Sequence, residues 1–117
     1  MKEDITCVFS LTLHEGKFPE FRDLVAKIVA ATKQEPGTLS YVYSVSADEK
    51  TVHIVERYNA DAVVSHVDET FAPFAKDFLS LVTIASLTVY GRPNQAIKER
   101  LDPFGAVYLM PFDGFTR

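Results

Sequence analysis

The fold of this chain is decided around the stretch EPGTLSY at residues 35–41. Pro36 has no backbone N–H and cannot continue a helix, whereas Gly37 permits a sharp change of direction. Over residues 38–46 apolar and polar side chains alternate, which is the period of a β-strand. This stretch therefore predicts a helix that ends at Pro36 and a strand that starts directly after Gly37.

The residues before this stretch predict one strand and one helix. Residues 5–13 alternate between apolar and mixed side chains and form a strand with one strongly apolar face. From Phe18 onward apolar side chains recur at helical spacing, and Pro19 suits the first turn of a helix. An amphipathic helix of this kind has to cover a sheet.

The residues after it predict a hairpin partner, a second helix and a fourth strand. The polar turn at residues 47–50 returns the chain into an antiparallel strand over residues 51–58. Asn59 can cap a helix, which Pro73 breaks into two segments, and residues 82–90 form the last strand. The resulting order β-α-β-β-α-β is the signature of a ferredoxin-like α+β fold.

The C-terminal part of the chain is more than this fold needs. A short helix is expected at residues 94–101 and a strand at residues 106–110. With 117 residues the chain supports one hydrophobic core. We therefore interpret it as a single domain, 1–117, with a fold core over residues 5–91 and an extension over residues 92–117.

Composition excludes several classes of partner. With Lys+Arg 12 against Asp+Glu 16, the formal charge is -4, so no basic excess attracts nucleic acid or anionic lipid. No apolar run approaches the ~20 residues that span a bilayer, and the N-terminal residues do not resemble a signal peptide. We expect a cytoplasmic protein with no nucleic-acid or membrane partner. The lone Cys7 is expected to be a small buried side chain.

The predicted topology also indicates self-association. Both helices lie on one face of a four-stranded sheet, which leaves the other face bare. A chain with 47% hydrophobic residues is not expected to leave such a face in water. A homodimer follows.

Four short signals carry a resemblance to a known family: residues 16–21, 35–41 and 56–62, and Ser65-His66 upstream of Phe71. In this order and spacing they resemble the antibiotic biosynthesis monooxygenase family, whose members are dimeric α/β barrels that mostly oxidise phenolic or quinol-like molecules without a bound cofactor. The resemblance implies two sheets packed face to face, a C-terminal segment that contacts the partner subunit, and a cavity between the sheet and the helices. It constrains the fold more than the reaction, because the family also contains an isomerase.

His66 is the first candidate for a catalytic residue. Imidazole titrates near neutrality, so on a helix facing an aromatic pocket it can accept the proton of a phenol or hydroquinone, and the resulting anion reacts directly with oxygen. Alternatively, His66 hydrogen-bonds Glu56 or a backbone carbonyl and only braces the helix.

Glu56 is the second candidate. It shares a strand face with Ile54 and Tyr58, so its carboxylate must find a donor or raise its pKa. It either orients His66 and assists catalysis, or pairs with an arginine across the sheet.

Several further side chains are candidates for contact with the substrate. Tyrosine hydroxyls can bind a polar substrate atom while aromatic rings stack on an aromatic ligand, although such residues often serve packing alone. An arginine just after the last strand can hold an anionic substituent. The candidates are Tyr41, Tyr43, Tyr58, Phe71, Phe74 and Phe78, with Ser10 and Arg92 as weaker ones.

No cofactor is expected from the motifs. The sequence has no glycine-rich phosphate loop, no pair of histidines at metal-ligand spacing, no cysteine cluster and no nucleophile elbow. The leading hypothesis is a cofactor-independent monooxygenase whose substrates are oxygen and a small aromatic or quinonoid molecule. Its alternatives are an isomerase on the same fold and a non-catalytic dimer that binds a small ligand.

Overall fold

The computed structural model describes residues 4–117, which form one sheet with helices beneath it. The strand order is β2-β3-β1-β4-β5, in which β5 runs parallel to β4 and every other pair is antiparallel. This confirms the predicted ferredoxin-like α+β fold with a C-terminal helix and strand. The regular elements are β1 (Asp4–Leu13), α1 (Phe18–Thr32), β2 (Thr38–Val45), β3 (Thr51–Asn59), α2 (Val63–Ser65), α3 (Ala75–Leu81), β4 (Val82–Tyr90), α4 (Gln95–Leu101) and β5 (Ala106–Leu109).

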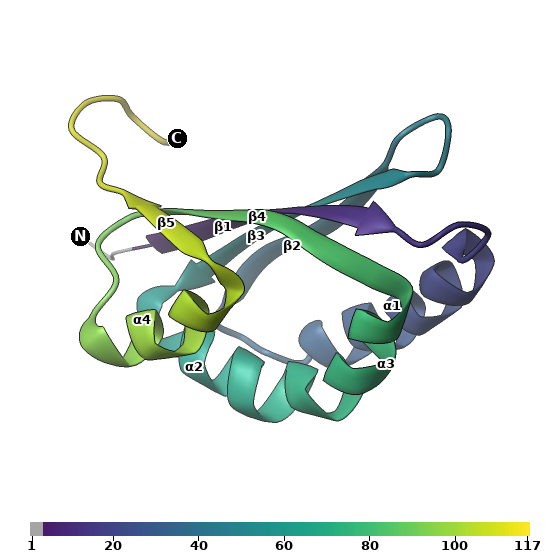
Figure 1. Ribbon diagram of the computed structural model, residues 1–117. Coiled ribbons are helices and arrows are strands. Elements are labelled where there is room, and N and C mark those ends of the chain that lie inside the picture. The colour runs from purple at the N-terminus through teal and green to yellow at the C-terminus, as the bar shows by residue number, and fades with distance from the viewer. Residues whose placement is uncertain (1–3) are drawn as a thin grey trace.

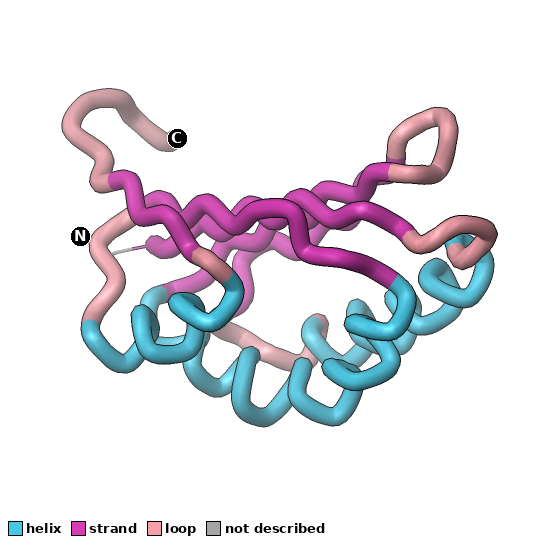
Figure 2. The backbone as a smooth tube through the Cα atoms, in the orientation of Figure 1, coloured by secondary structure: helices cyan, strands magenta, loops and turns pink. Residues whose placement is uncertain are grey.

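The helices occupy one face of the sheet only. Figure 1 shows α1, α2, α3 and α4 below the strands, and Figure 2 shows the upper face of the sheet without any helix. Amphipathic helices bury their apolar stripe against one sheet face, and this leaves a single layer of side chains on the other. The functional side chains described below lie between the sheet and the helices.

The first helix ends earlier than the sequence predicts. α1 stops at Thr32 rather than at Pro36, because tight turns follow it, with the Gln34 and Glu35 amides donating to the carbonyls of Ala31 and Thr32. A residue that precedes proline is disfavoured in the helical region, so Glu35 leaves the helix. The consequence is that the Glu35 side chain is free to turn towards the interior.

Gly37 fixes this turn against the next helical segment. A Cβ atom built on Gly37 would lie 2.6 Å from the Cβ of Ala62, which is too close for any side chain. In addition, the Asn59 amide donates to the Gly37 carbonyl at 2.8 Å. The turn after α1 is thereby held beside the start of the second helical region.

That second helical region is irregular, as the proline predicted. A 3₁₀ turn at Ala60–Ala62 leads into α2, a π-helical segment covers His66–Phe71, and a second 3₁₀ turn at Ala72–Phe74 contains Pro73 before α3 begins. A π-helical segment is wider than an α-helix and often marks a functional site. Here it starts at His66.

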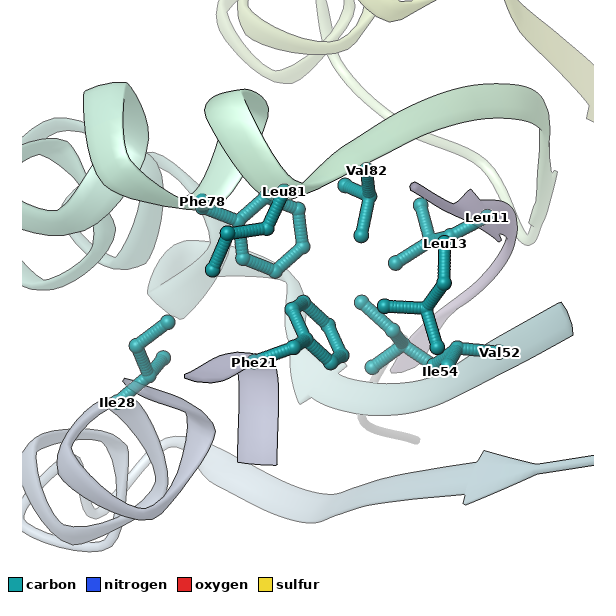
Figure 3. Close-up of a cluster of buried hydrophobic side chains, with 9 residues drawn as sticks. All are labelled: Leu11, Leu13, Phe21, Ile28, Val52, Ile54, Phe78, Leu81 and Val82. Atoms are coloured by element: carbon teal, nitrogen blue, oxygen red, sulfur yellow. The ribbon is translucent and has the colours of Figure 1, made fainter. Parts of the chain in front are cut away.

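Two apolar clusters form the core. The cluster at the α1 and α3 end, drawn in Figure 3, consists of Leu11, Leu13, Phe21, Ile28, Val52, Ile54, Phe78, Leu81 and Val82. The cluster at the α4 end consists of Ile5, Cys7, Tyr58, Val63, Leu87, Val89, Ile97 and Leu101. Cys7 is 1% exposed, as predicted for a small buried side chain.

The outer face of the sheet carries a row of four valines and one threonine that crosses all of its strands. The strand registers align Val42, Val55, Val8, Thr88 and Val107 side by side. Val42, Val55 and Val107 are 52%, 42% and 57% exposed. Among the residues described, no helix has the length and apolar character that a membrane span requires.

Candidate active site

A small cavity lies where the two core clusters meet, between the inner face of the sheet and the helices. Its volume is about 40 Å³, which is room for a few water molecules. Nearly all of its lining is aromatic or aliphatic. The lining residues are Cys7, Phe9, Tyr41, Tyr43, Ile54, Glu56, Tyr58, Val63, His66, Val67, Phe71, Phe78, Ile84, Leu101 and Phe104.

On the helix side of the cavity, His66 and Glu35 form a hydrogen-bonded dyad. His66 Nδ1 lies 2.9 Å from Glu35 Oε1, which also accepts a hydrogen bond from Thr38 Oγ1 at 2.8 Å, while Oε2 accepts one from Thr70 Oγ1 at 2.5 Å. A carboxylate only accepts, so Nδ1 carries the hydrogen and Nε2 of the neutral ring is a free acceptor. Glu35 thus sets both the orientation and the tautomer of His66.

The environment of His66 favours the neutral ring. Its side chain is 6% exposed, and burial lowers its pKa, although the hydrogen bond and the charge of Glu35 partly offset this. The ring packs against Tyr41 and Tyr58, with centroid separations of 5.3 Å in each case. A buried neutral imidazole with one free nitrogen has the form of a general base.

On the sheet side of the cavity, Glu56 and Tyr58 form a second buried pair. The Tyr58 hydroxyl donates to Glu56 Oε1, and Glu56 is 5% exposed. Burial raises the pKa of Glu56 to about 8, with the Tyr58 hydrogen bond acting in the opposite direction and the charge of Glu35 in the same one. The Glu56 carboxyl is therefore mainly protonated at neutral pH.

The partners predicted for Glu56 and His66 are wrong. Glu56 was expected to orient His66 or to pair with an arginine, but the His66 partner is Glu35. Arg57 instead pairs with Asp4. Glu35 entered the sequence analysis only as part of a helix stop, because its inward turn depends on α1 ending at Thr32.

Most of the predicted contact residues line the cavity. Tyr41 and Tyr43 face it from β2, where their hydroxyl oxygens are 2.7 Å apart and burial raises the pKa of both. Both are therefore neutral hydrogen-bonding groups at physiological pH. The other predicted residues on the lining are Glu56, Tyr58, His66, Phe71 and Phe78.

Three predicted contact residues lie elsewhere. Ser10 is on the outer face, because side chains alternate along β1 and its neighbour Phe9 points inward. Phe74 packs beside the apolar cluster of Figure 3 without lining the cavity. Arg92 is exposed and donates to the Pro111 carbonyl at 3.1 Å.

The C-terminal extension contributes a wall of the cavity that the sequence analysis missed. Leu101 and Phe104 line it, and the Phe104 ring meets Phe9 edge-on at 5.8 Å. An ion pair of 3.1 Å between Arg100 and Asp68 ties α4 to the π-helical segment. Among residues 4–117, no group of three or more potential ligand side chains could hold a metal ion.

Comparison with known proteins decides the family. A model of the antibiotic biosynthesis monooxygenase family matches residues 4–69, which is more than half of the chain. The chain belongs to this family. The match ends within the π-helical segment, so it includes Glu35, Glu56, Tyr58 and His66. A search of curated proteins finds no match.

Several solved structures share the fold of this chain, although their sequences are at most 21% identical to it in the examples that follow. MupZ from Pseudomonas fluorescens has a TM-score of 0.87 at 21% identity and covers 100% of this chain and 91% of its own. SnoaB, a cofactor-independent oxygenase from Streptomyces nogalater, has a TM-score of 0.67 at 19% identity and covers 80% and 96%. A conserved protein from Methanosarcina mazei Go1 has a TM-score of 0.69 at 15% identity and covers 80% and 95%.

Proposed function

We propose that this protein is a cofactor-independent monooxygenase of a small phenolic or quinol-like molecule, with His66 as the general base. The observation that carries the proposal is the Glu35–His66 dyad, which leaves the second nitrogen of a neutral imidazole without a partner among the described residues, on a side chain that lines an aromatic cavity. Membership of the monooxygenase family and the fold shared with SnoaB support it.

The reaction can be written for a phenol with hydrogen at the para carbon. His66 Nε2 accepts the hydroxyl proton, and the phenolate transfers one electron to oxygen. The substrate radical and superoxide combine at the para carbon, and the peroxide takes the proton back from His66. Loss of the remaining para hydrogen and cleavage of the O–O bond give a quinone and water, so one oxygen atom enters the product and the other leaves as water.

The lining of the cavity supports this chemistry. Apolar walls exclude water, which favours a reactive anion held beside oxygen over its reprotonation by solvent. Neutral hydroxyls of Tyr41 and Tyr43 are available to a polar substrate atom. A positioned general base contributes typically 10²–10⁴-fold to a rate.

The size of the cavity indicates that the wall must move when a substrate enters. Ligand pockets are roughly 300–1,000 Å³, whereas this cavity is about 40 Å³. Tyr41 also lines a surface groove of about 350 Å³ beside Thr32, Lys33 and Ser40. Tyr41 therefore lines both the cavity and this groove, which lies between the end of α1 and the edge strand β2.

The proposed enzyme is a homodimer that buries the outer face of the sheet. Val42, Val55 and Val107 of the row on this face are exposed in a single subunit, and exposed apolar patches of this kind mark interfaces. After β5 the chain continues as a tail on the same side, seen in yellow above the sheet in Figure 1, and Met110, Phe112 and Phe115 of this tail are exposed. Analytical ultracentrifugation should show a dimer, and a monomer at micromolar concentration would contradict this part of the proposal.

Oxygen uptake tests the proposed reaction. Purified protein is supplied with a panel of hydroquinones, anthrones and catechols, and wild type is compared with His66→Ala, with His14→Ala and with buffer alone. His14 is an exposed histidine outside the cavity lining, so it is the matched control. Uptake that needs protein, survives in His14→Ala and falls at least about tenfold in His66→Ala would support the proposal. Uptake no faster than autoxidation across the panel would contradict it and favour an isomerase or a binding dimer.

A further inference from the structure

We propose that Glu56 is the general acid of this site, which delivers the proton that turns the departing peroxide oxygen into water. The inference rests on the proposed monooxygenase function and assigns to Glu56 a role separate from that of the base. It starts from the position of the carboxyl group on the sheet side of the cavity, opposite the helix that carries His66.

The strand registers place Glu56 at the centre of the inner face. It pairs with Cys7 of β1 on one side and with Tyr41 of β2 on the other. His66 packs on the rings of Tyr41 and Tyr58, which are the two tyrosines adjacent to Glu56. A substrate in the cavity would therefore lie against the acid and the base at once.

No cation neutralises Glu56. No ion pair of Glu56 is found among residues 4–117, and Arg57 points to the outer face, where it pairs with Asp4. Of the surrounding groups only His66 can become a cation, and burial keeps it neutral, while the charge of Glu35 opposes a second negative charge nearby. The titratable groups around Glu56 are Cys7 from β1, Tyr41 and Tyr43 from β2, Tyr58 from β3, Glu35 from the turn after α1, and His66 from the π-helical segment.

The hydrogen bond from Tyr58 orients the acid. Because the Tyr58 hydroxyl donates to Oε1, the carboxyl hydrogen is favoured on Oε2, which has no hydrogen-bond partner among the described residues. A buried carboxyl without a cation and with one neutral donor stays protonated. Burial accordingly raises the pKa of Glu56 to about 8, close to the value at which a general acid works best at neutral pH.

The acid is needed in the second half of the reaction, when the O–O bond of the peroxide breaks. When His66 Nε2 removes the hydrogen from the carbon that bears the peroxide, the C–H electron pair forms the new C=O bond and the O–O bond breaks. The departing hydroxide would be a poor leaving group in an apolar cavity, and the Glu56 proton converts it to water. The proton on His66 then returns to Glu56, so neither residue is consumed.

Infrared spectroscopy tests the protonation state without any substrate. Difference spectra of wild type between pH 6 and pH 10 should show a carboxylic acid carbonyl band that disappears with a midpoint near pH 8. Glu56→Gln should lack the band, and Glu20→Gln, a change at an exposed carboxylate, should retain it. Absence of the band in wild type at pH 6 would overturn the proposal.

Product analysis tests the role itself. In Glu56→Gln the amide keeps the size of the acid and can accept from Tyr58, but it cannot deliver a proton. In a single turnover with enzyme in excess over substrate, the rate of quinone formation should fall at least about tenfold relative to the rate of hydroperoxide formation, so that a substrate hydroperoxide accumulates. Equal loss of both rates, or no loss of either, would overturn the acid role.

These outcomes separate the two proposals. If wild type consumes no oxygen with any substrate of the panel, the monooxygenase function fails, and the acid role in this reaction fails with it. If His66-dependent uptake is found but Glu56→Gln makes quinone at the wild-type rate, only the acid role fails.

Discussion

The two sides of the cavity each hold a glutamate, and they surround it with different hydrogen-bond donors. Glu35 on the helix side accepts three hydrogen bonds, from His66, Thr38 and Thr70. Glu56 on the sheet side accepts one, from a tyrosine hydroxyl, and has no cation beside it. The number and kind of donors, rather than the residue type, therefore distinguish the two carboxyl groups in this interior.

The difference follows from the elements that supply each side. The turn after α1 and the π-helical segment bring two hydroxyls and an imidazole to Glu35, whereas the inner face of a sheet offers only the side chains of alternate residues. Around Glu56 these are Cys7, Tyr41 and Tyr58. One side is consequently suited to support a base, and the other to store a proton.

The largest effect on catalysis is expected from a change to the Glu35–His66 hydrogen bond on the helix side. In Glu35→Gln the amide can donate to Nδ1 of His66, which moves the ring hydrogen to Nε2 and removes the free acceptor. We expect kcat for oxygen uptake to fall by about 10² or more with KM nearly unchanged. Steady-state kinetics of this variant beside Glu20→Gln would check it, and a wild-type kcat in Glu35→Gln would show that the dyad has no part in catalysis.

Glu56, on the sheet side, should make the free energy of unfolding depend on pH. The pKa of Glu56 is raised from 4.5 to about 8 on folding. The contribution of its protonated carboxyl to the free energy of unfolding is therefore fully present below pH 4.5 and is lost as pH rises to about 8. The expected slope from this group is about 1.4 kcal/mol of unfolding free energy per pH unit in that window. Urea unfolding of wild type and Glu56→Gln at a series of pH values measures it, and identical slopes would contradict the burial of a neutral carboxyl.

His66 should give a slope of opposite sign in acid. Burial lowers the pKa of His66 below 6.5. The contribution of its neutral ring to the free energy of unfolding is therefore present above about pH 6.5 and is lost as pH falls through the lowered pKa. A change to Phe removes the titrating group while retaining a planar ring. We expect His66→Phe to lose less stability than wild type between pH 6.5 and pH 5. A larger acid loss in the variant would mean that His66 is charged in the folded protein.

The smallest effect is expected from Tyr58→Phe. The hydroxyl of Tyr58 is the only donor to Glu56 among the residues described, and its hydrogen bond lowers the pKa of that carboxyl against the effect of burial. Its removal should move the infrared titration of Glu56 to higher pH. A shift to lower pH would show that another group, for example an ordered water, replaces the hydroxyl as a better donor.

The strands and their faces could be predicted from the sequence because alternation is local. The positions of Tyr41, Tyr43, Glu56 and Tyr58 on the cavity follow from that period alone. The same period explains the error at Ser10: its neighbour Phe9 takes the inner position, so Ser10 has to face outward.

The partners within the site could not be predicted, because they depend on how distant segments meet. Glu35 reaches His66 only because α1 ends at Thr32 and the Gly37 turn packs against Ala62. Phe104 lines the cavity because α4 folds back under the sheet (Figure 1). Neither arrangement leaves a local signal in the sequence.

A single NMR titration would test the difference between the two sides most directly. Protein labelled with ¹³C at glutamate carboxyls and ¹⁵N at histidine rings is followed from pH 4 to pH 10, with Glu56→Gln and His66→Ala to assign the signals. The structure predicts that the Glu56 carboxyl titrates near pH 8, and that His66 titrates below pH 6.5 with its hydrogen on Nδ1. A Glu56 signal that titrates near pH 4.5, or a His66 ring protonated above pH 7, would contradict the assignment of an acid and a base to the two sides.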